Sequence, residues 1–234
     1  VAALLLVTVR DRPNHDLGQP AEQAEARESS GPVLSGWTVG RALRSRKFYL
    51  IALATMLASF TYSAVLPQIG DHLATEGMSA AVVPFAISLL AAFGMMGKLF
   101  FGFFSERFTA RRAMMLSLGG QTVFVFMMVG LASPPAVWVS VALFGFFMGG
   151  YGTLLTLIVQ ENFGVRHFGS ISGLVAMASV VPFFVGPLVA GASFDLTDGY
   201  GPAFIAVTGL FAIAIAVLTQ VSQPDPEFRT AFAR

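Results

Sequence analysis

The chain of 234 residues is strongly apolar, since 55% of its residues are hydrophobic and 12% are charged, whereas soluble domains carry about 25% charged residues. Its net charge of +1 and its lack of cysteine exclude a basic nucleic-acid-binding domain, disulfides, thiol catalysis and cysteine-ligated metals. The 24 Gly and 23 Phe residues are typical of membrane-spanning helices, so the composition favours an integral membrane protein.

The N-terminal region predicts the end of one span followed by a linker. Residues 1–9 (VAALLLVTV) are apolar but too few to cross a bilayer, which takes about 20 residues, and they lack the upstream basic flank of a signal peptide. We interpret them as the cytoplasmic end of a truncated transmembrane helix. Residues 10–47 then predict a cytoplasmic linker, polar and disordered over most of its length. Its end, WTVGRALRSRK (37–47), predicts either a short interfacial helix or a basic stop before the next span.

Six later stretches are long and apolar enough to span a bilayer, and their separators are rich in charge, Gly and Pro. The stretches cover residues 48–68, 81–104, 113–132, 136–159, 170–193 and 201–221. The sequence therefore predicts an all-α membrane protein with a six-helix transmembrane domain over residues 48–221 and a cytoplasmic tail over 222–234.

The distribution of basic residues predicts the orientation of these spans. Lys and Arg occur before the first span, between the second and third, between the fourth and fifth, and after the sixth, while the other three connections carry none. By the positive-inside rule, the linker and the C-terminus are cytoplasmic in a multi-pass protein of the cell membrane.

The spans differ in polarity. The third and sixth are almost uniformly apolar, which predicts an outer, lipid-facing layer, whereas the others carry polar residues and prolines that suit an inner layer around a cavity. Two glycine pairs at a spacing of four, Gly145 with Gly149 and Gly169 with Gly173, predict close helix contacts.

Lys98 is the only Lys, Arg, Asp or Glu deep inside a predicted span. It lies nine residues before Arg107, or about 13 Å from the cytoplasmic edge and near the midplane. A charge there costs at least about 2.5 kcal/mol and usually faces a substrate or ion pathway. An ammonium group predicts an anionic ligand or a carboxylate on another helix; the alternative is a lysine that snorkels toward the cytoplasm.

Two tyrosines inside the spans, Tyr62 and Tyr151, are further candidates for a substrate pocket, although either would also serve as a helix–helix hydrogen bond. The sequence contains no Ser-His-Asp set, no metal-ligand spacing and no nucleotide-binding loop. We therefore predict neither an enzyme nor a cofactor or metal site.

The connection between the second and third spans resembles a known signature. GFFSERFTARR, from Gly102 to Arg112, is similar to the cytoplasmic loop motif Gly-x-x-x-Asp-Arg-x-Gly-Arg-Arg of the major facilitator superfamily, with Glu106 and Thr109 in place of the Asp and the second Gly. GKLFFGFFSER, ENFGVRHFGSISG and GASFDLTDGYGPAF resemble the branch of monocarboxylate and oxalate/formate transporters.

The resemblance implies a secondary transporter, a symporter or antiporter, in which two six-helix halves rock around a midplane site. This chain would be the C-terminal half, with the bilayer, an N-terminal half and a small organic anion as partners. Lys98 would bind a carboxylate as the branch's Arg does. The fifth span lacks the lysine of oxalate transporters, which favours a monocarboxylate.

The resemblance also implies that the loop motif controls the conformation at the cytoplasmic face. The motif residues concerned are Gly102, Glu106, Arg107, Arg111 and Arg112. Two alternatives remain open for the function. One is a transporter of neutral or amphipathic compounds, in which Lys98 is structural, and the other is a membrane sensor or scaffold without transport.

Overall fold

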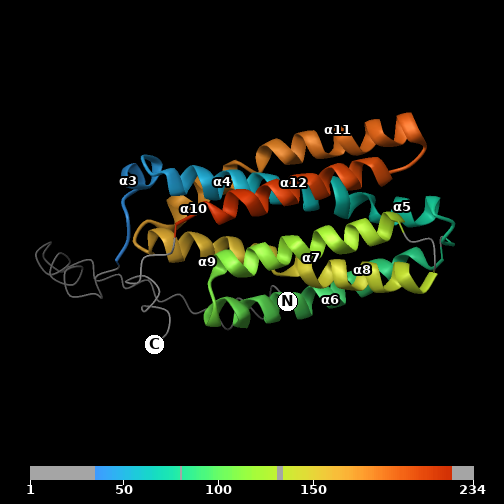
Figure 1. Cartoon of the computed structure of the whole chain (residues 1–234), viewed down its shortest axis with the longest axis horizontal. Helices are drawn as coiled ribbons and strands as arrows, with labels where there is room; N and C mark the ends of the chain where they lie inside the picture. The colour runs from blue at the N-terminus through green and yellow to red at the C-terminus, as the bar shows by residue number, and fades with distance from the viewer. Residues whose placement is uncertain (1–34, 80, 131–133, 223–234) are drawn as a thin grey trace, which may run out of the picture. The chain divides into compact units, whose positions relative to one another are not determined.

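The computed structural model describes residues 35–79, 81–130 and 134–222, all of which belong to one compact unit that begins at Ser35. The predicted truncated helix (1–9), the linker up to residue 34 and the tail from residue 223 lie outside the described residues. Within these described residues, six spans are long and apolar enough to cross a membrane, which confirms the all-α class and the six predicted spans. Figure 1 labels the helices that form them. The spans cover Arg46–Thr75, Val83–Arg107, Ala110–Gly130, Pro135–Phe163, Phe168–Thr197 and Gly201–Thr219.

Three spans are single α-helices: α6 (Val83–Arg107), α7 (Ala110–Gly130) and α12 (Gly201–Thr219). The fourth span consists of α8 (Pro134–Gly149) and α9 (Tyr151–Phe163), and the fifth of α10 (Phe168–Met177) and α11 (Val180–Thr197).

The first span changes its winding along its length. It begins as α4 (Arg46–Ala58), continues as a π-helix (Thr61–Val65) and a 3-10 turn (Leu66–Gln68), and ends as α5 (Ile69–Thr75). Pro67 contributes here because it has no N–H for an α-helical hydrogen bond. The span is longer than predicted because the polar residues after Gln68 continue the helix.

The end of the linker is tied to the connection between α9 and α10. Gly36 and Gly164 form an isolated antiparallel bridge, and the Trp37 N–H donates to the Phe163 carbonyl at 2.8 Å. A short helix, α3 (Val39–Leu43), follows within the segment predicted as interfacial or as a basic stop, and the Arg41 guanidinium lies 4.4 Å from the centre of the Trp37 ring. Its position in the membrane interface stays a prediction.

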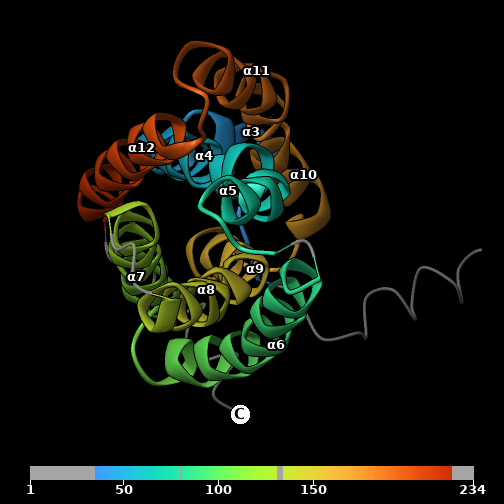
Figure 2. The same ribbon diagram turned by 90° about the vertical axis from the view of Figure 1, so that its right-hand side faces the viewer.

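The third and sixth spans pack along each other, as Figure 2 shows for α7 and α12. They are not the most exposed spans of this unit: 39% and 44% of the residues in their most apolar stretches are buried, against 22% in the second and fifth. The second and fifth spans lie on the flanks of the bundle, with α6 and α11 at opposite edges in Figure 2. Exposure within this unit does not test which spans face the lipid, so the predicted outer layer of the third and sixth spans stays a prediction.

Glycines join the second span closely to the fourth. A Cβ atom on Gly149 would overlap the Gly94 carbonyl oxygen, and one on Gly97 would overlap that of Phe146. The close contact predicted at Gly145 and Gly149 is thus present. Gly169 and Gly173 differ, because a Cβ on either would meet no atom of the described residues within 4 Å.

Candidate functional site

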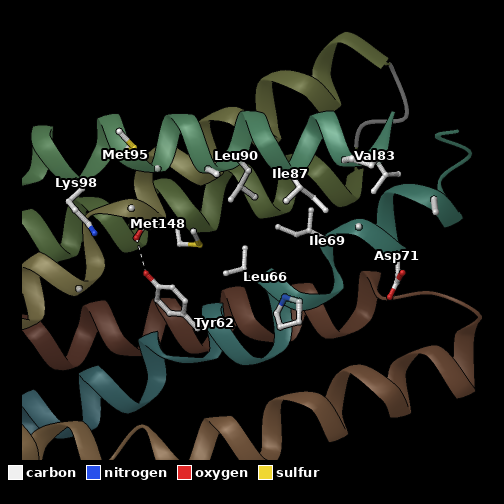
Figure 3. A pocket seen from close by; sticks show the side chains of 18 residues that line it. Tyr62, Leu66, Ile69, Asp71, Val83, Ile87, Leu90, Met95, Lys98 and Met148 are labelled. Carbon is white, nitrogen blue, oxygen red and sulfur yellow. Dashed lines mark hydrogen bonds between the residues drawn. The ribbon is translucent and has the colours of Figure 1, made fainter. Parts of the chain in front are cut away.

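A cavity of about 940 Å³ opens between the first span, α6 and the junction of α8 with α9. Figure 3 shows the 18 residues that line it. All of them except Tyr62, Asp71 and Lys98 are aliphatic residues, methionines, prolines or glycines. The cavity is therefore an apolar space with three polar side chains, the composition expected of a small-molecule site.

Lys98 lies on the face of α6 that lines this cavity, nine residues before the end of the helix at Arg107. Its side chain is exposed in this unit, and its amino group points toward the cavity in Figure 3. The neighbouring Gly97 is buried against Phe146 of α8, which holds this turn of α6 in place. The ammonium is thus presented to the cavity from a rigidly packed turn.

The two candidate tyrosines occupy different positions. Tyr62, on the π-helix, lines the cavity, and its hydroxyl donates to the Met148 carbonyl at 3.4 Å. Tyr151, on α9, is 7% exposed and is not part of the lining; its ring centre lies 5.4 Å from that of Tyr62. Tyr151 packs against the Tyr62 ring and does not face the cavity.

The Tyr151 hydroxyl belongs to a network that sequence reasoning missed. It lies 2.8 Å from the Ser59 Oγ and donates to the Thr55 carbonyl at 3.1 Å. The Ser59 Oγ lies in turn 2.8 Å from the Ser179 Oγ. Ser59 follows α4, Tyr151 begins α9 and Ser179 precedes α11, so the network joins the interruptions of the first, fourth and fifth spans. Single serines in apolar spans gave no signal of this meeting point.

Asp71 was also missed as a site residue, because it falls in the segment predicted as an outer connection. It lies on α5 and lines the end of the cavity opposite Lys98 (Figure 3). The cavity therefore carries a positive and a negative side chain at its two ends.

The residues of the loop motif lie at the other end of α6. Glu106, Arg107 and Arg112 are exposed, and Gly102 is half-buried. The Arg111 guanidinium makes a tertiary hydrogen bond, which it donates to the Val221 carbonyl. The motif is thus anchored to the end of the sixth span through this arginine.

Two residues outside the predicted set organise the start of α7. Glu161, at the end of the fourth span, is buried, and its two oxygens accept from the Ala110 N–H at 3.0 and 3.1 Å. The Thr109 hydroxyl accepts from the Arg112 N–H at 3.2 Å, as an N-cap does. Thr109, which departs from the family motif, therefore has a capping role. A carboxylate at a helix N-terminus is also favoured by the helix dipole.

Six apolar spans in the described residues, three of which line a cavity with a charged side chain, define a multi-pass α-helical membrane protein. The sequence pattern of the Major Facilitator Superfamily matches residues 1–187 and again residues 48–234. The chain belongs to this superfamily of transporters, as the loop motif predicted.

The chain is similar to two kinds of curated transporter. It is 23% identical over 220 residues to monocarboxylate transporter 12 of Rattus norvegicus, a match covering 85% of the chain and 45% of that protein. It is 28% identical over 222 residues to the hexuronate transporter of Escherichia coli strain K12, covering 90% of the chain and 50% of that protein. These relatives bear out the resemblance to the monocarboxylate branch, and the chain spans about half of their length.

Proposed function

We propose that this chain is the C-terminal half of a secondary transporter that moves an organic anion, a monocarboxylate, by alternating access. Lys98 binds the carboxylate, and Tyr62 contributes a hydroxyl to the same site. The remaining wall comes from an N-terminal six-helix half, because sites in such transporters lie between the two halves. The similarity to transporters named for monocarboxylates and hexuronate supports an acidic substrate.

The observation that carries the proposal is the place of Lys98 in the cavity. Among the cavity-lining residues it is the only cation, on a wall that is otherwise apolar. An ammonium in such surroundings is stabilised by an anion, and charged residues within spans usually face a substrate pathway. Because Lys offers a point charge and not the planar fork of Arg, it suits one carboxylate group without bidentate geometry.

Transport of neutral or amphipathic compounds is the second candidate, and the apolar lining favours it. In that case Lys98 has no ligand role, and lipophilic compounds compete for transport better than carboxylates do. A sensor or scaffold would bind a ligand without flux across the membrane.

Uptake by the full-length parent in proteoliposomes tests the proposal. A panel of labelled monocarboxylates is compared for the wild type, Lys98→Gln and the control Arg44→Gln, which removes an exposed cation outside the cavity lining. We expect Lys98→Gln to lose about thirtyfold or more of carboxylate uptake, since removing one partner of a desolvated charge pair costs about 2 kcal/mol or more. Arg44→Gln should transport as the wild type does.

Each alternative has its own outcome. Wild-type uptake by Lys98→Gln, with correct folding, would show that Lys98 is not a substrate ligand. Competition by lipophilic neutral compounds but by no carboxylate would favour the second candidate. Binding without uptake would favour a sensor.

The loop motif carries a separate proposal about gating. We infer that Glu106, Arg107, Arg111 and Arg112, with Gly102 in the same turn, stabilise one conformation at the cytoplasmic face. Arg111 supports this through its bond to the Val221 carbonyl. Arg107→Ala should change both the transport rate and the labelling of cysteines introduced at the cytoplasmic mouth; if both measurements match the wild type, the motif does not gate.

The topology remains part of the same proposal. The linker and the C-terminus are placed in the cytoplasm by the positive-inside rule. Cysteines introduced at positions 44 and 222 should react with an impermeant maleimide only after the membrane is opened.

A further inference from the structure

One face of α6 forms a long, straight wall of the cavity. Val83, Ile87, Ala91, Met95 and Lys98 recur at intervals of three or four residues and therefore lie on the same side of this uninterrupted helix. All of them except Lys98 are apolar. At about 1.5 Å per residue, Lys98 is about 16 Å from Ile87 and about 22 Å from Val83 along the helix axis.

The facing wall is also apolar and approaches α6 closely at its far end. Leu66, Ile69 and Gly70 line the cavity from the 3-10 turn and α5. A Cβ atom on Gly70 would lie 3.4 Å from the Val83 side chain and 3.5 Å from that of Ile87. The cavity is therefore a groove that extends from Lys98 to the level of Ile87 and narrows there.

Asp71 follows Gly70 and lies at this far end, opposite Lys98 (Figure 3). The two charges are therefore about 16 Å or more apart along α6. A compact anion of two or three carbons bound to Lys98 would leave most of the apolar wall uncovered and would not come near Asp71.

From this arrangement, and resting on the carboxylate site proposed above, we propose that the substrate is an amphipathic monocarboxylate. Its carboxylate binds Lys98 and its unsubstituted apolar tail lies along the α6 wall between Leu66 and Ile87. Asp71 acts as a specificity residue that rejects acids with a second carboxylate at the far end of the chain.

Three physical effects support this substrate class. Each methylene that moves from water to the apolar wall strengthens binding by about threefold to fourfold. A hydroxylated tail gains less, because a buried hydroxyl without a hydrogen-bond partner carries a desolvation cost. A second carboxylate beside Asp71 is repelled by like charge.

Displacement of radiolabelled octanoate from the full-length parent in nanodiscs tests the proposal. Competitors are the straight-chain monocarboxylates from acetate to dodecanoate, the primary alcohol and the α,ω-dicarboxylate of each length, and glucuronate as a hydroxylated acid. We expect affinity to rise with each methylene until the tail reaches Ile87. Dicarboxylates that span the groove should bind at least tenfold more weakly than monocarboxylates of equal length, and Asp71→Asn should reduce this difference.

Two tryptophan variants locate the tail. Ile87→Trp fills the far end of the groove. The monocarboxylate that binds most tightly should therefore be shorter by several methylenes than for the wild type. Ile213→Trp, on an exposed face of α12 outside the lining, should leave the series unchanged. Leu66→Trp provides a second blocking variant should Ile87→Trp fail to fold.

The outcomes separate this inference from the proposed function. If binding does not depend on chain length, or if glucuronate competes best, the amphipathic class is wrong while a carboxylate site at Lys98 stands. If carboxylates bind no better than their alcohols, and Lys98→Gln changes neither, the carboxylate site itself is wrong.

Discussion

The second and fifth spans lie on two flanks of the bundle and are equally exposed, yet they are attached to it differently. In the most apolar stretch of each, 22% of the residues are buried. The second span, α6, meets α8 through glycines at which backbone touches backbone. The fifth span meets the first mainly at side chains: a Cβ on Gly186 of α11 would overlap the Ser63 Oγ and Cβ and lie 3.0 Å from the Ser63 backbone carbonyl carbon, and Ser179 is hydrogen-bonded to Ser59.

The difference teaches that exposure alone does not describe how firmly a helix is held. A backbone-to-backbone contact has no rotamer with which to adjust, whereas a serine side chain can rotate. We therefore expect α6 and α8 to move as one body, which keeps Lys98 in a constant relation to the fourth span. The α10–α11 span, interrupted beside Ser179, is the more adjustable of the two.

The largest expected loss of stability comes from adding a methyl group to the glycine contact between α6 and α8. Gly149→Ala should lower the free energy of unfolding by about 3 kcal/mol, because the added Cβ overlaps the Gly94 backbone and overpacking of this kind is costly. The measurement is an SDS titration of the full-length parent. Gly209→Ala is the matched control, since a Cβ at this position on α12 meets no described atom within 4 Å. Equal stability of both variants would mean that α6 and α8 are not locked together.

A smaller loss is expected for the equivalent change in the fifth span. Gly186→Ala should cost about 1–2 kcal/mol in the same titration, because its Cβ would overlap the Ser63 Oγ and Cβ, of which only the Oγ can rotate away. The double variant with Ser63→Gly should recover part of the loss, since the two residues touch. A loss as large as that of Gly149→Ala would show that both flanks are held equally rigidly.

The network of hydroxyl groups around Ser59 should contribute less to the free energy of unfolding than either glycine contact. Tyr151→Phe removes the bonds to the Ser59 Oγ and the Thr55 carbonyl but leaves the bond between Ser59 and Ser179. We expect a loss of about 1 kcal/mol, typical of a buried hydrogen bond. Tyr49→Phe, at a side chain that is 60% exposed, is the control. An unchanged stability for Tyr151→Phe would mean that the Tyr151 hydrogen bonds do not help to hold the fourth span to the first.

The smallest change in stability is expected for a glycine substitution on α10. Gly173→Ala should leave the stability of this six-helix unit unchanged or raise it by up to about 1 kcal/mol, because alanine is the better helix former and its Cβ has room. The same variant in the full-length parent sharpens the comparison. A loss of stability there would show that another part of the protein covers this face of α10.

Much of the fold could be predicted because the bilayer constrains it strongly. A span needs about 20 apolar residues, and charges between spans follow one rule, so the number of spans follows from local sequence. The prediction that Gly145 and Gly149 pack closely was confirmed for the same kind of reason, since small residues mark helix contacts. The interruption of the first span was not predicted, because only Pro67 signals it and the π-helical turn precedes that residue.

For the site, the sequence by itself determined that Lys98 is exceptional, because the cost of a charge inside a span depends on its depth, which can be counted along the helix. Only the tertiary structure decided what Lys98 faces, that Tyr62 lines the cavity while Tyr151 lies behind it, and that Asp71 closes the far end. Those distinctions depend on which side of each helix meets another helix. Residues far apart in the sequence, such as Ser59, Tyr151 and Ser179, come together only when the spans pack, so no local pattern records their meeting.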